Sequence, residues 1–595
     1  MTNFEIEQIA FDKASIRKRE DPPGPLSNWP VVYALNNESD VYVGETGNAL
    51  LRMLQHRKDP RKQHLTVASV LLDESFHRSA CYDLEALLIQ WFYADGTYNV
   101  LNANDGHRNE AYPGRDVFQE RFREVFAEFR NRGMFTQTLE QIENSEFFKL
   151  SPFKSLVADQ ERAILDVLDT LFDDIESGRG ASMVIAGHPG TGKTIVGISL
   201  VKTLKDIELS RGIGDSEQAS PISDYFARGY PELLKYLAGG DSSSPRPLRV
   251  GFVVPQQSLR ESIGRVFDRT PGLSKSMVLT AFDVGQSAEK FDVLVVDEAH
   301  RLNQRANQPS GSLNAKFAEI NRRLFTSDST DRTQLDWIRE QSRFSILLLD
   351  PEQSVRPADL PPEVVGEVVG EAKASHHYFP LATQMRVAAG SDYVGFIRNV
   401  LAGRETATPD LGDYEFGLFD DIRAMEAAIR KRDRKHGLSR LATGYAWEWK
   451  SDPKKKALSG VPLANRPYDI EIDGRRWRWN SAPKDWISSP NALEEFGSIH
   501  TLQGYDLNYA GVVIGPDLYF DTAAQRIRFD RSNYFDKKGV ENNPKRGIVY
   551  TDDDIERYVK NVYAVLLTRG IRGTFVYVCD GALREHLRRV IPPMA

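Results

Sequence analysis

The fold is decided by residues 182–194, which read SMVIAGHPGTGKT. The last eight residues, from Gly187 to Thr194, match the pattern G-x-x-x-x-G-K-[ST] in full. An apolar run precedes them and the helix-like TIVGISLVKTL follows, which is the strand–loop–helix context of a phosphate-binding loop. Glycines let backbone N–H groups turn towards a phosphate, Lys193 would reach the β- and γ-phosphates, and Thr194 would bind Mg²⁺. The predicted nucleotide-binding residues are Gly187, Gly190, Gly192, Lys193 and Thr194.

A second strand end carries two acids. Residues 293–300 read VLVVDEAH, so four apolar residues lead into Asp297 and Glu298. Asp297 would hold Mg²⁺, and Glu298 would polarise the water that attacks the γ-phosphate. Together with the phosphate-binding loop, this strand predicts an NTPase that uses ATP and Mg²⁺.

Outward from these motifs, apolar runs alternate with helical stretches from about residue 150 onward. Nearly continuous Val, Ile and Leu runs are typical of buried parallel strands with helices on both faces. We expect such strands at residues 182–186, 250–254, 293–296, 345–349, 511–514 and 574–578. Polar stretches at residues 212–247 and 431–490 interrupt the pattern.

The N-terminal part has a different pattern. Short β-rich runs at 31–35 and 41–43 lie among helical stretches, and apolar residues at helical spacing predict a connecting helix over 115–131 that ends before Gly133. Residues 1–28 are polar overall and read as an arm or linker.

Composition limits the class of protein. A chain of 595 residues is long enough for several domains. Its only cysteines, Cys81 and Cys579, exclude a disulfide framework and a cysteine-based zinc site, and they favour a reducing cytoplasm. No run of about 20 apolar residues predicts a membrane span. The net charge of −8 argues against a nucleic-acid partner, since phosphate repels an acidic chain.

Further short motifs follow in a fixed order. They are residues 159–160 (DQ), 253–256 (VVPQ), 349–353 (LDPEQ), 384–386 (QMR), 497–506 (GSIHTLQGYD) and 565–573 (VLLTRGIRG). In this order they resemble superfamily 1 helicases, and more closely a Schlafen-type, group 3-like DNA/RNA helicase domain. The resemblance covers about residues 150–580 and implies two RecA-like parallel-sheet lobes.

The resemblance also implies roles for single residues. Gln160 would read adenine, Gln353 would sense the γ-phosphate, and Gln503 with Gly504 would couple nucleotide to strand. Arg386 and Arg569 would reach the phosphates from the second lobe, so that hydrolysis depends on closure of the cleft. The acid that usually follows the Gln-Gly pair is displaced to Asp506, whose role stays open. DNA or RNA, strand polarity and duplex unwinding also stay open, so translocase is the safer term.

Residues 475–480 read RRWRWN and have two interpretations. Trp and Arg can stack on and bind single-stranded nucleic acid. The favoured interpretation is a β-hairpin whose tryptophans pack on the second lobe.

In the N-terminal part, residues 31–44 read VVYALNNESDVYVG, and Arg52, His56, Glu85 and Asn99 follow. This pattern resembles the GIY-YIG nuclease module over about residues 29–105, with Val31 and Val32 in place of the first Gly and Ile. The resemblance implies that Glu85 holds Mg²⁺ or Mn²⁺, that Arg52 neutralises phosphate charge, and that Tyr33 or Tyr42 acts as general base with a neighbour such as His56. Basic residues over 56–62 fit either a DNA backbone contact or a solvated loop.

The sequence therefore predicts an α/β chain with a small nuclease domain and two motor lobes. The expected segments are an arm (1–28), the nuclease domain (29–105), a helical connector (106–149), the first lobe (150–375) and the second lobe (376–595) with an insertion at about 431–490. Its function would be ATP-driven translocation on DNA, with RNA not excluded, coupled to cleavage of foreign (phage) DNA. DNA repair or processing, and an ATP-switched binding protein without cleavage, are the alternatives. A homo-oligomer or an accessory defence protein stays open.

Overall fold

The computed structural model describes residues 4–19, 24–102, 112–152, 156–209, 225–226, 248–306, 308, 310–351, 353–383, 391–404, 406–452, 454–482, 486–502 and 505–594. Arg386, Gln503 and Gly504 lie outside these residues, as does nearly all of the polar stretch 212–247. The chain divides into two compact units. The first unit is Met1–Val157 with Ile198–Arg246 and Val266–Leu273, and the second is Ala158–Gly197, Pro247–Arg265 and Ser274–Ala595.

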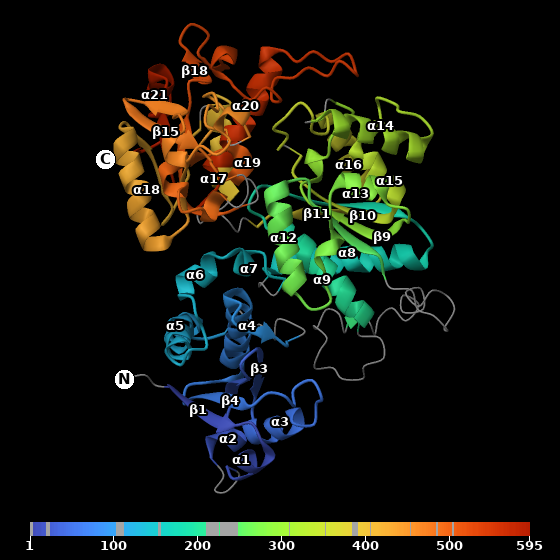
Figure 1. Cartoon of the computed structure of the whole chain (residues 1–595), viewed down its shortest axis with the longest axis vertical. Helices are drawn as coiled ribbons and strands as arrows, with labels where there is room; N and C mark the ends of the chain where they lie inside the picture. Colours follow the sequence, from blue (N-terminus) through green and yellow to red (C-terminus); the bar gives the residue numbers. More distant parts are fainter. Residues whose placement is uncertain are drawn as a thin grey trace. The chain divides into compact units, whose positions relative to one another are not determined.

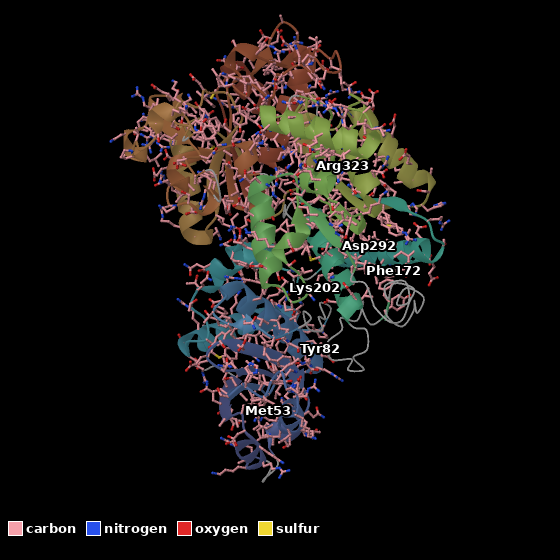
Figure 2. The ribbon with its side chains drawn as sticks, turned by 45° about the vertical axis from the view of Figure 1, so that its right-hand side comes forward. Met53, Tyr82, Phe172, Lys202, Asp292 and Arg323 are labelled. Atoms are coloured by element: carbon pink, nitrogen blue, oxygen red, sulfur yellow. The ribbon has the colours of Figure 1, made fainter. Side chains whose placement is uncertain are left out.

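The first unit is built on a five-stranded sheet in the order β1-β4-β2-β3-β5 (Figure 1). The strands are β1 (Phe4–Ala10), β2 (Val31–Asn36), β3 (Asp40–Thr46), β4 (Val67–Asp73) and β5 (Asn99–Val100). All neighbours are antiparallel except β3 and β5. Side chains alternate between two cores. Tyr33 packs with Met53 of α3 (Ala49–His56) on one face, and Val32 packs with Leu84 of α4 (Arg78–Asp95) on the other. Figure 2 labels Met53 and Tyr82 on these two helices.

The interpretation of residues 1–28 as an arm is wrong for the segment from Phe4 to Ile16. Strand β1 pairs with β4 over its whole length, and Ile6, Ile9 and Phe11 are buried. Helix α1 (Lys13–Arg17) begins at Asp12, whose carboxylate caps it, and buries Ile16 completely. The segment is polar on average because polar residues lie between the buried apolar ones, and the average composition therefore gave no sign of a strand.

The expected connecting helix is confirmed as α5 (Arg115–Asn131). Its aromatic face joins the core beneath α4, and Gly133 follows in the left-handed conformation with a φ of 78°. Short helices α2 (Pro25–Asn28), α6 (Leu139–Asn144) and α7 (Glu146–Lys149) complete the unit.

The second unit begins with a six-stranded sheet in the order β11-β6-β10-β9-β7-β8 (Figure 1). The strands are β6 (Ala181–Gly187), β7 (Val250–Val253), β8 (Val278–Leu279), β9 (Phe291–Val296), β10 (Ser342–Leu349) and β11 (Tyr378–Leu381), and every pairing is parallel. Its helices are α8 (Ala158–Glu176), α13 (Ala281–Gln286), α14 (Gly311–Phe325), α15 (Gln334–Gln341) and α16 (Pro362–Ala374). Helices α9 (Lys193–Leu209) and α12 (Gln257–Arg269) begin in this unit, and from Ile198 and Val266 onward they belong to the first unit. We call this sheet with its helices the first lobe; Figure 2 labels Asp292 in β9 and Arg323 in α14.

The second lobe contains an eight-stranded sheet in the order β14-β15-β16-β13-β17-β20-β12-β21. Its strands are β12 (Glu415–Phe419), β13 (Ser439–Thr443), β14 (Ile470–Ile472), β15 (Arg475–Trp479), β16 (Glu495–Gly497), β17 (Leu507–Ile514), β20 (Gly570–Val578) and β21 (Pro593–Met594). Only the β14–β15 pairing is antiparallel. The lobe also contains the hairpin of β18 (Leu518–Asp521) and β19 (Arg526–Phe529), and helices α17 (Ser391–Leu401), α18 (Ile422–His436), α19 (Ile499–Leu502), α20 (Asp552–Leu567) and α21 (Gly581–Leu587).

These sheets confirm the predicted α/β class, and each of the strand runs expected from the sequence coincides with a strand. The polar stretch 431–490 differs from expectation, because β13 lies inside it and pairs with β17 in the middle of the sheet. The hairpin interpretation of residues 475–480 is confirmed. Trp477 and Trp479 are almost fully buried in the core of the second lobe, so neither ring offers a stacking surface.

Candidate functional site

The phosphate-binding loop joins the end of β6 to the start of α9. Gly190 and Gly192 have φ angles of 90° and 78°, a conformation that favours glycine. A Cβ atom on Gly192 would lie 2.2 Å from Nε2 of Gln160, so this close approach requires glycine. Gln160 is itself buried and donates to the carbonyl of Thr191 at 2.9 Å, which places it against the loop.

Two side chains at the start of α9 face the loop and the acidic strand. Lys193 is buried, and its ammonium donates to the carbonyls of Gly187 and His188 at 2.6 and 3.1 Å. The hydroxyl of Thr194 donates to Asp297 Oδ2 at 2.9 Å. The structure therefore brings the two motifs into direct contact.

The two acids after β9 occupy different electrostatic environments. Burial, together with the charge of Glu298, raises the pKa of Asp297. Burial would also raise the pKa of Glu298, but His300 and Lys193 outweigh it and hold that pKa below its usual range. Glu298 has a φ of 46°. Left-handed conformations of residues other than glycine carry strain and cluster at functional sites.

His300 lies beside Glu298. The backbone N–H of Asp350 donates to His300 Nδ1 at 3.2 Å, so a neutral imidazole carries its proton on Nε2. That Nε2 lies 3.1 Å from Glu298 Oε2. The ring thus connects the acidic strand end to the loop that follows β10.

The loop after β10 brings Gln353 to the same site. Gln353 is 3% exposed, and its Nε2 atom has no hydrogen-bond partner among the described residues. It lines a small cavity with Pro189 of the phosphate-binding loop and residues of α17 and α20. A buried amide donor without a partner beside a phosphate-binding loop fits a ligand oxygen.

The sequence did not single out Arg398 of α17, which also lines this cavity. It lies outside the contiguous motifs, so no local signal marks it. The structure places Arg569, the expected arginine finger, in a buried position where its guanidinium donates to the carbonyl of Tyr505 at 3.4 Å. The phosphate role predicted for Arg569 stays a prediction.

A second, much larger hollow lies between residues of the two lobes. This groove has a volume of about 700 Å³ and is lined by residues from 255–260, 280–282, 301–316 and 356–359 of the first lobe, and from 445–454, 480–505 and 538–543 of the second. Gln256, from the expected nucleic-acid motif, is among them. The lining cations are Arg260, Arg301, Lys316, Arg356, Lys454 and Lys538, against two carboxylates, Asp359 and Glu541.

Two side chains of the first lobe, Arg356 and Gln304, contact residues of the second lobe. Arg356, three residues after Gln353, contacts the ring of His500 and lies 3.5 Å from Asp536. Gln304 donates to Pro357 O at 2.6 Å and accepts from Arg546 at 2.7 Å. Arg356 of the groove thus lies three residues from Gln353, which lines the small cavity beside the phosphate-binding loop.

The first unit gathers the residues expected of a nuclease. Tyr33 Oη lies 2.7 Å from His56 Nε2, and the Tyr42 ring lies 5.0 Å from the His56 ring. Tyr33 and His56 are buried, and Glu85 is 8% exposed on α4. Burial raises the pKa of Tyr33 well above its usual value, while Arg52 opposes that shift.

Lys62 contacts this cluster although no motif includes it. Its ammonium lies 2.9 Å from His56 Nδ1 and 3.5 Å from the centre of the Tyr42 ring. Burial, reinforced by Lys62 and Arg52, lowers the pKa of His56 to about 3. An ammonium only donates, so His56 Nδ1 accepts, and the neutral ring carries its proton on Nε2, which faces Tyr33. In this state His56 donates to Tyr33 rather than taking a proton from it.

The role expected of Asn99 stays a prediction. Asn99 is exposed and donates to Asp40 at 2.9 Å. Instead, the buried Asn102 bonds both the N–H and the carbonyl of Val43, in the strand that carries Tyr42. In the sequence, the only sign of this contact is that Asn102 lies two residues after β5, which pairs with the strand of Val43.

Among the described residues, no group of three or more His, Cys, Asp or Glu side chains is arranged to hold a metal ion. No helix among them is long and apolar enough to cross a membrane.

Parallel strands, a phosphate-binding loop and an acidic strand end that meet in one unit define a P-loop protein with a two-lobed motor architecture. A family model described as Schlafen group 3, DNA/RNA helicase domain, matches residues 180–580. The chain belongs to this family, and the membership indicates a nucleic-acid-related ATPase or helicase activity. The chain is also 26% identical over 468 residues to the protein "Uncharacterized protein YPL245W" of Saccharomyces cerevisiae, an alignment that covers 73% of this chain and 91% of the yeast protein.

Proposed function

We propose that the protein is an ATP-driven nucleic-acid translocase whose N-terminal part cleaves phosphodiester bonds. The observation that carries the motor is that one short loop serves two sites. Gln353 lines the small cavity beside the phosphate-binding loop, and Arg356, three residues later, lines the basic groove. Binding or hydrolysis of the nucleotide would thereby move the groove residue Arg356 through three residues of loop.

The nucleotide site fits ATP and Mg²⁺. Glycine is required at Gly192, Gln353 Nε2 has no partner among the described residues, and Thr194 with Asp297 supplies the oxygen ligands that Mg²⁺ prefers. When bound, Mg²⁺ supplies charge neutralisation at the phosphates. Glu298, held by His300, would orient the attacking water, and Gln160 would contact the base from its position against the loop.

The groove fits a single strand of nucleic acid. Six cations and two carboxylates line it, which favours a phosphate backbone. Half-buried aromatic rings that bases can stack on are Phe282, Tyr445, Trp449 and Tyr505. DNA is the proposed partner, with RNA as the second candidate.

ATPase measurements with single-stranded DNA, duplex DNA and RNA in parallel test the motor. We expect stimulation by at least one of them, loss in Lys193→Ala, and weaker binding with a salt slope reduced by about 1 in Lys454→Glu. Lys431→Glu, an equally exposed change on α18 away from the groove, is the matched control. ATPase activity indifferent to all three nucleic acids would contradict the motor.

The second activity rests on the cluster of Tyr33, Tyr42, His56 and Glu85. Glu85 would hold a divalent ion, which supplies Lewis-acid polarisation of the scissile phosphate. Tyr33 receives a hydrogen bond from His56, so Tyr42 is the better candidate for general base, and Arg52 would neutralise phosphate charge. The biological role that we propose is cleavage of foreign (phage) DNA in the cytoplasm.

Labelled DNA incubated with Mg²⁺ or Mn²⁺, with and without ATP, tests the nuclease. We expect cleavage by the wild type, loss in Glu85→Gln, and no change in Glu74→Gln, an exposed acid of the same domain. Cleavage that survives Glu85→Gln would place the site elsewhere. No cleavage by the wild type under any condition would favour the alternative of an ATP-switched binding protein. The biological role is tested by plating phage on cells with and without the protein, and equal plating efficiency would favour DNA repair or processing.

A further inference from the structure

Arg398 lies on α17 of the second lobe and reaches the nucleotide site of the first lobe. Its Nη2 atom donates to Asp350 Oδ2 at 3.3 Å, and its Nη1 atom lies 3.3 Å from Nδ1 of His188. Asp350 is fully buried at the end of β10, and His188 belongs to the phosphate-binding loop. One guanidinium therefore joins both ends of the nucleotide site to the second lobe.

The surroundings of Arg398 point to a ligand. The small cavity that it lines also contains Pro189 of the phosphate-binding loop and Gln353, whose buried Nε2 has no partner among the described residues. Asn561 and Thr568 of the second lobe complete the lining together with apolar residues. Two nitrogen donors, one from each lobe, thus converge beside the phosphate-binding loop.

The two contacts of Arg398 described above differ in kind. The contact with Asp350 is an ion pair with a fully buried carboxylate, which holds the guanidinium at the nucleotide site. His188 is a neutral acceptor at the long end of the hydrogen-bond range, because burial lowers its pKa. A guanidinium bonds phosphate oxygens more strongly than it bonds a neutral nitrogen, so a terminal phosphate would replace His188 once the cavity, about 10 Å³ in this structure, widens to admit it.

We propose that Arg398 binds the terminal phosphate of the nucleoside triphosphate and makes closure of the lobes depend on it. This inference rests on the proposed ATP site and adds a residue from outside the motifs that predicted Arg386 and Arg569. It concerns discrimination between triphosphate and diphosphate, since only the triphosphate places a phosphate at this point. Asp350 and His188 are the residues that hold the guanidinium in reach.

Equilibrium binding of fluorescent nucleotides to the full chain tests the inference without turnover. We expect Arg398→Ala and the length-matched Arg398→Gln to bind a non-hydrolysable ATP analogue about 10- to 150-fold more weakly than the wild type. Their affinity for ADP should stay within about twofold of the wild-type value, because ADP lacks the contacted phosphate. Arg404→Ala, beyond the end of the same helix where Arg404 bonds Asn399, is the control and should change neither affinity.

Equal affinities for the analogue in Arg398→Gln and the wild type would overturn the inference, as would equal weakening of analogue and ADP. Lys193→Ala separates this failure from failure of the proposed function. If Lys193→Ala loses both nucleotides while Arg398→Gln loses neither, the ATP site stands and Arg398 has no phosphate role. If the wild type binds neither nucleotide, the proposed function itself fails.

Discussion

Replacing Thr194 with valine tests the contact between the phosphate-binding loop and the acidic strand. Valine keeps the branched shape but removes the hydroxyl that donates to Asp297 at 2.9 Å. Asp297 is completely buried, so water cannot replace the lost donor. A hydrogen bond to a charged group contributes about 1.5–3 kcal/mol. We therefore expect kcat/KM for ATP to fall about 10- to 150-fold, since about 1.4 kcal/mol corresponds to a factor of ten.

The assay is steady-state ATP hydrolysis over a Mg²⁺ titration. Thr194→Ser keeps the hydroxyl and should stay near the wild-type rate. Thr170→Val is the control for the loss of a hydroxyl alone, because Thr170 bonds only its own helix, at Asp166 O. A kcat/KM for Thr194→Val within threefold of the wild type, with an unchanged Mg²⁺ requirement, would refute the role assigned to this contact.

Three further perturbations follow from the geometry. Gly44→Ala should abolish cleavage and leave ATP hydrolysis intact, because its Cβ would lie 2.3 Å from Tyr33 Oη; full cleavage by this variant would contradict the site. The pKa of His56, about 3 when folded, lies below its usual value, so the unfolded chain binds more protons between about pH 6.5 and 3 and stability falls as pH drops. Hydrogen exchange of β2 should show a loss of about 2 kcal/mol from pH 7.5 to 5 that His56→Gln removes; equal losses in both proteins would count against it. Gln304→Leu breaks the contact with Arg546 and should weaken nucleic-acid stimulation of the ATPase while basal hydrolysis persists; parallel loss of both rates would argue for misfolding instead.

Most of the fold could be predicted because buried parallel strands leave a direct trace in the sequence. Strands β9 and β10 are buried over nearly their whole length, so each contains a continuous apolar run, at residues 293–296 and 346–349. Strand β1 could not be found this way, because the polar residues Glu5, Glu7 and Gln8 lie around its buried Ile6 and Ile9 and leave no continuous apolar run. Strand β13 was not predicted, because it lies inside a polar stretch and contains Ser439, Arg440 and Thr443. All five of its residues are nevertheless buried, since hydrogen bonds satisfy the polar groups of these three.

The site could be predicted where its residues lie in contiguous motifs. Thr194 and Asp297 were paired from sequence because each motif has a fixed position at a strand end. Their contact is possible because β6 and β9 end at the same edge of the parallel sheet, with only β10 between them. Lys62 was predicted only as part of the basic stretch 56–62, and its contact with His56 was not foreseen. Arg398 was not predicted at all, since it reaches Asp350 by a tertiary contact that no spacing encodes. The same limit explains Asn102, whose bonds to Val43 depend on the pairing of β3 with β5.

The net charge of −8 argued against a nucleic-acid partner, and the groove shows why that argument was made on the wrong scale. In physiological salt a phosphate interacts mainly with charges within about 8 Å, and not with the sum over 595 residues. Six cations and two carboxylates line the groove, which gives an excess of four positive charges there. Cations of the groove are paired too, as Lys538 is with Glu541 and Arg356 with Asp536, so the net excess of positive charge in the lining is what a phosphate would meet. A basic groove on an acidic chain would therefore bind nucleic acid locally, through a field that the charges elsewhere on the chain are too distant to cancel.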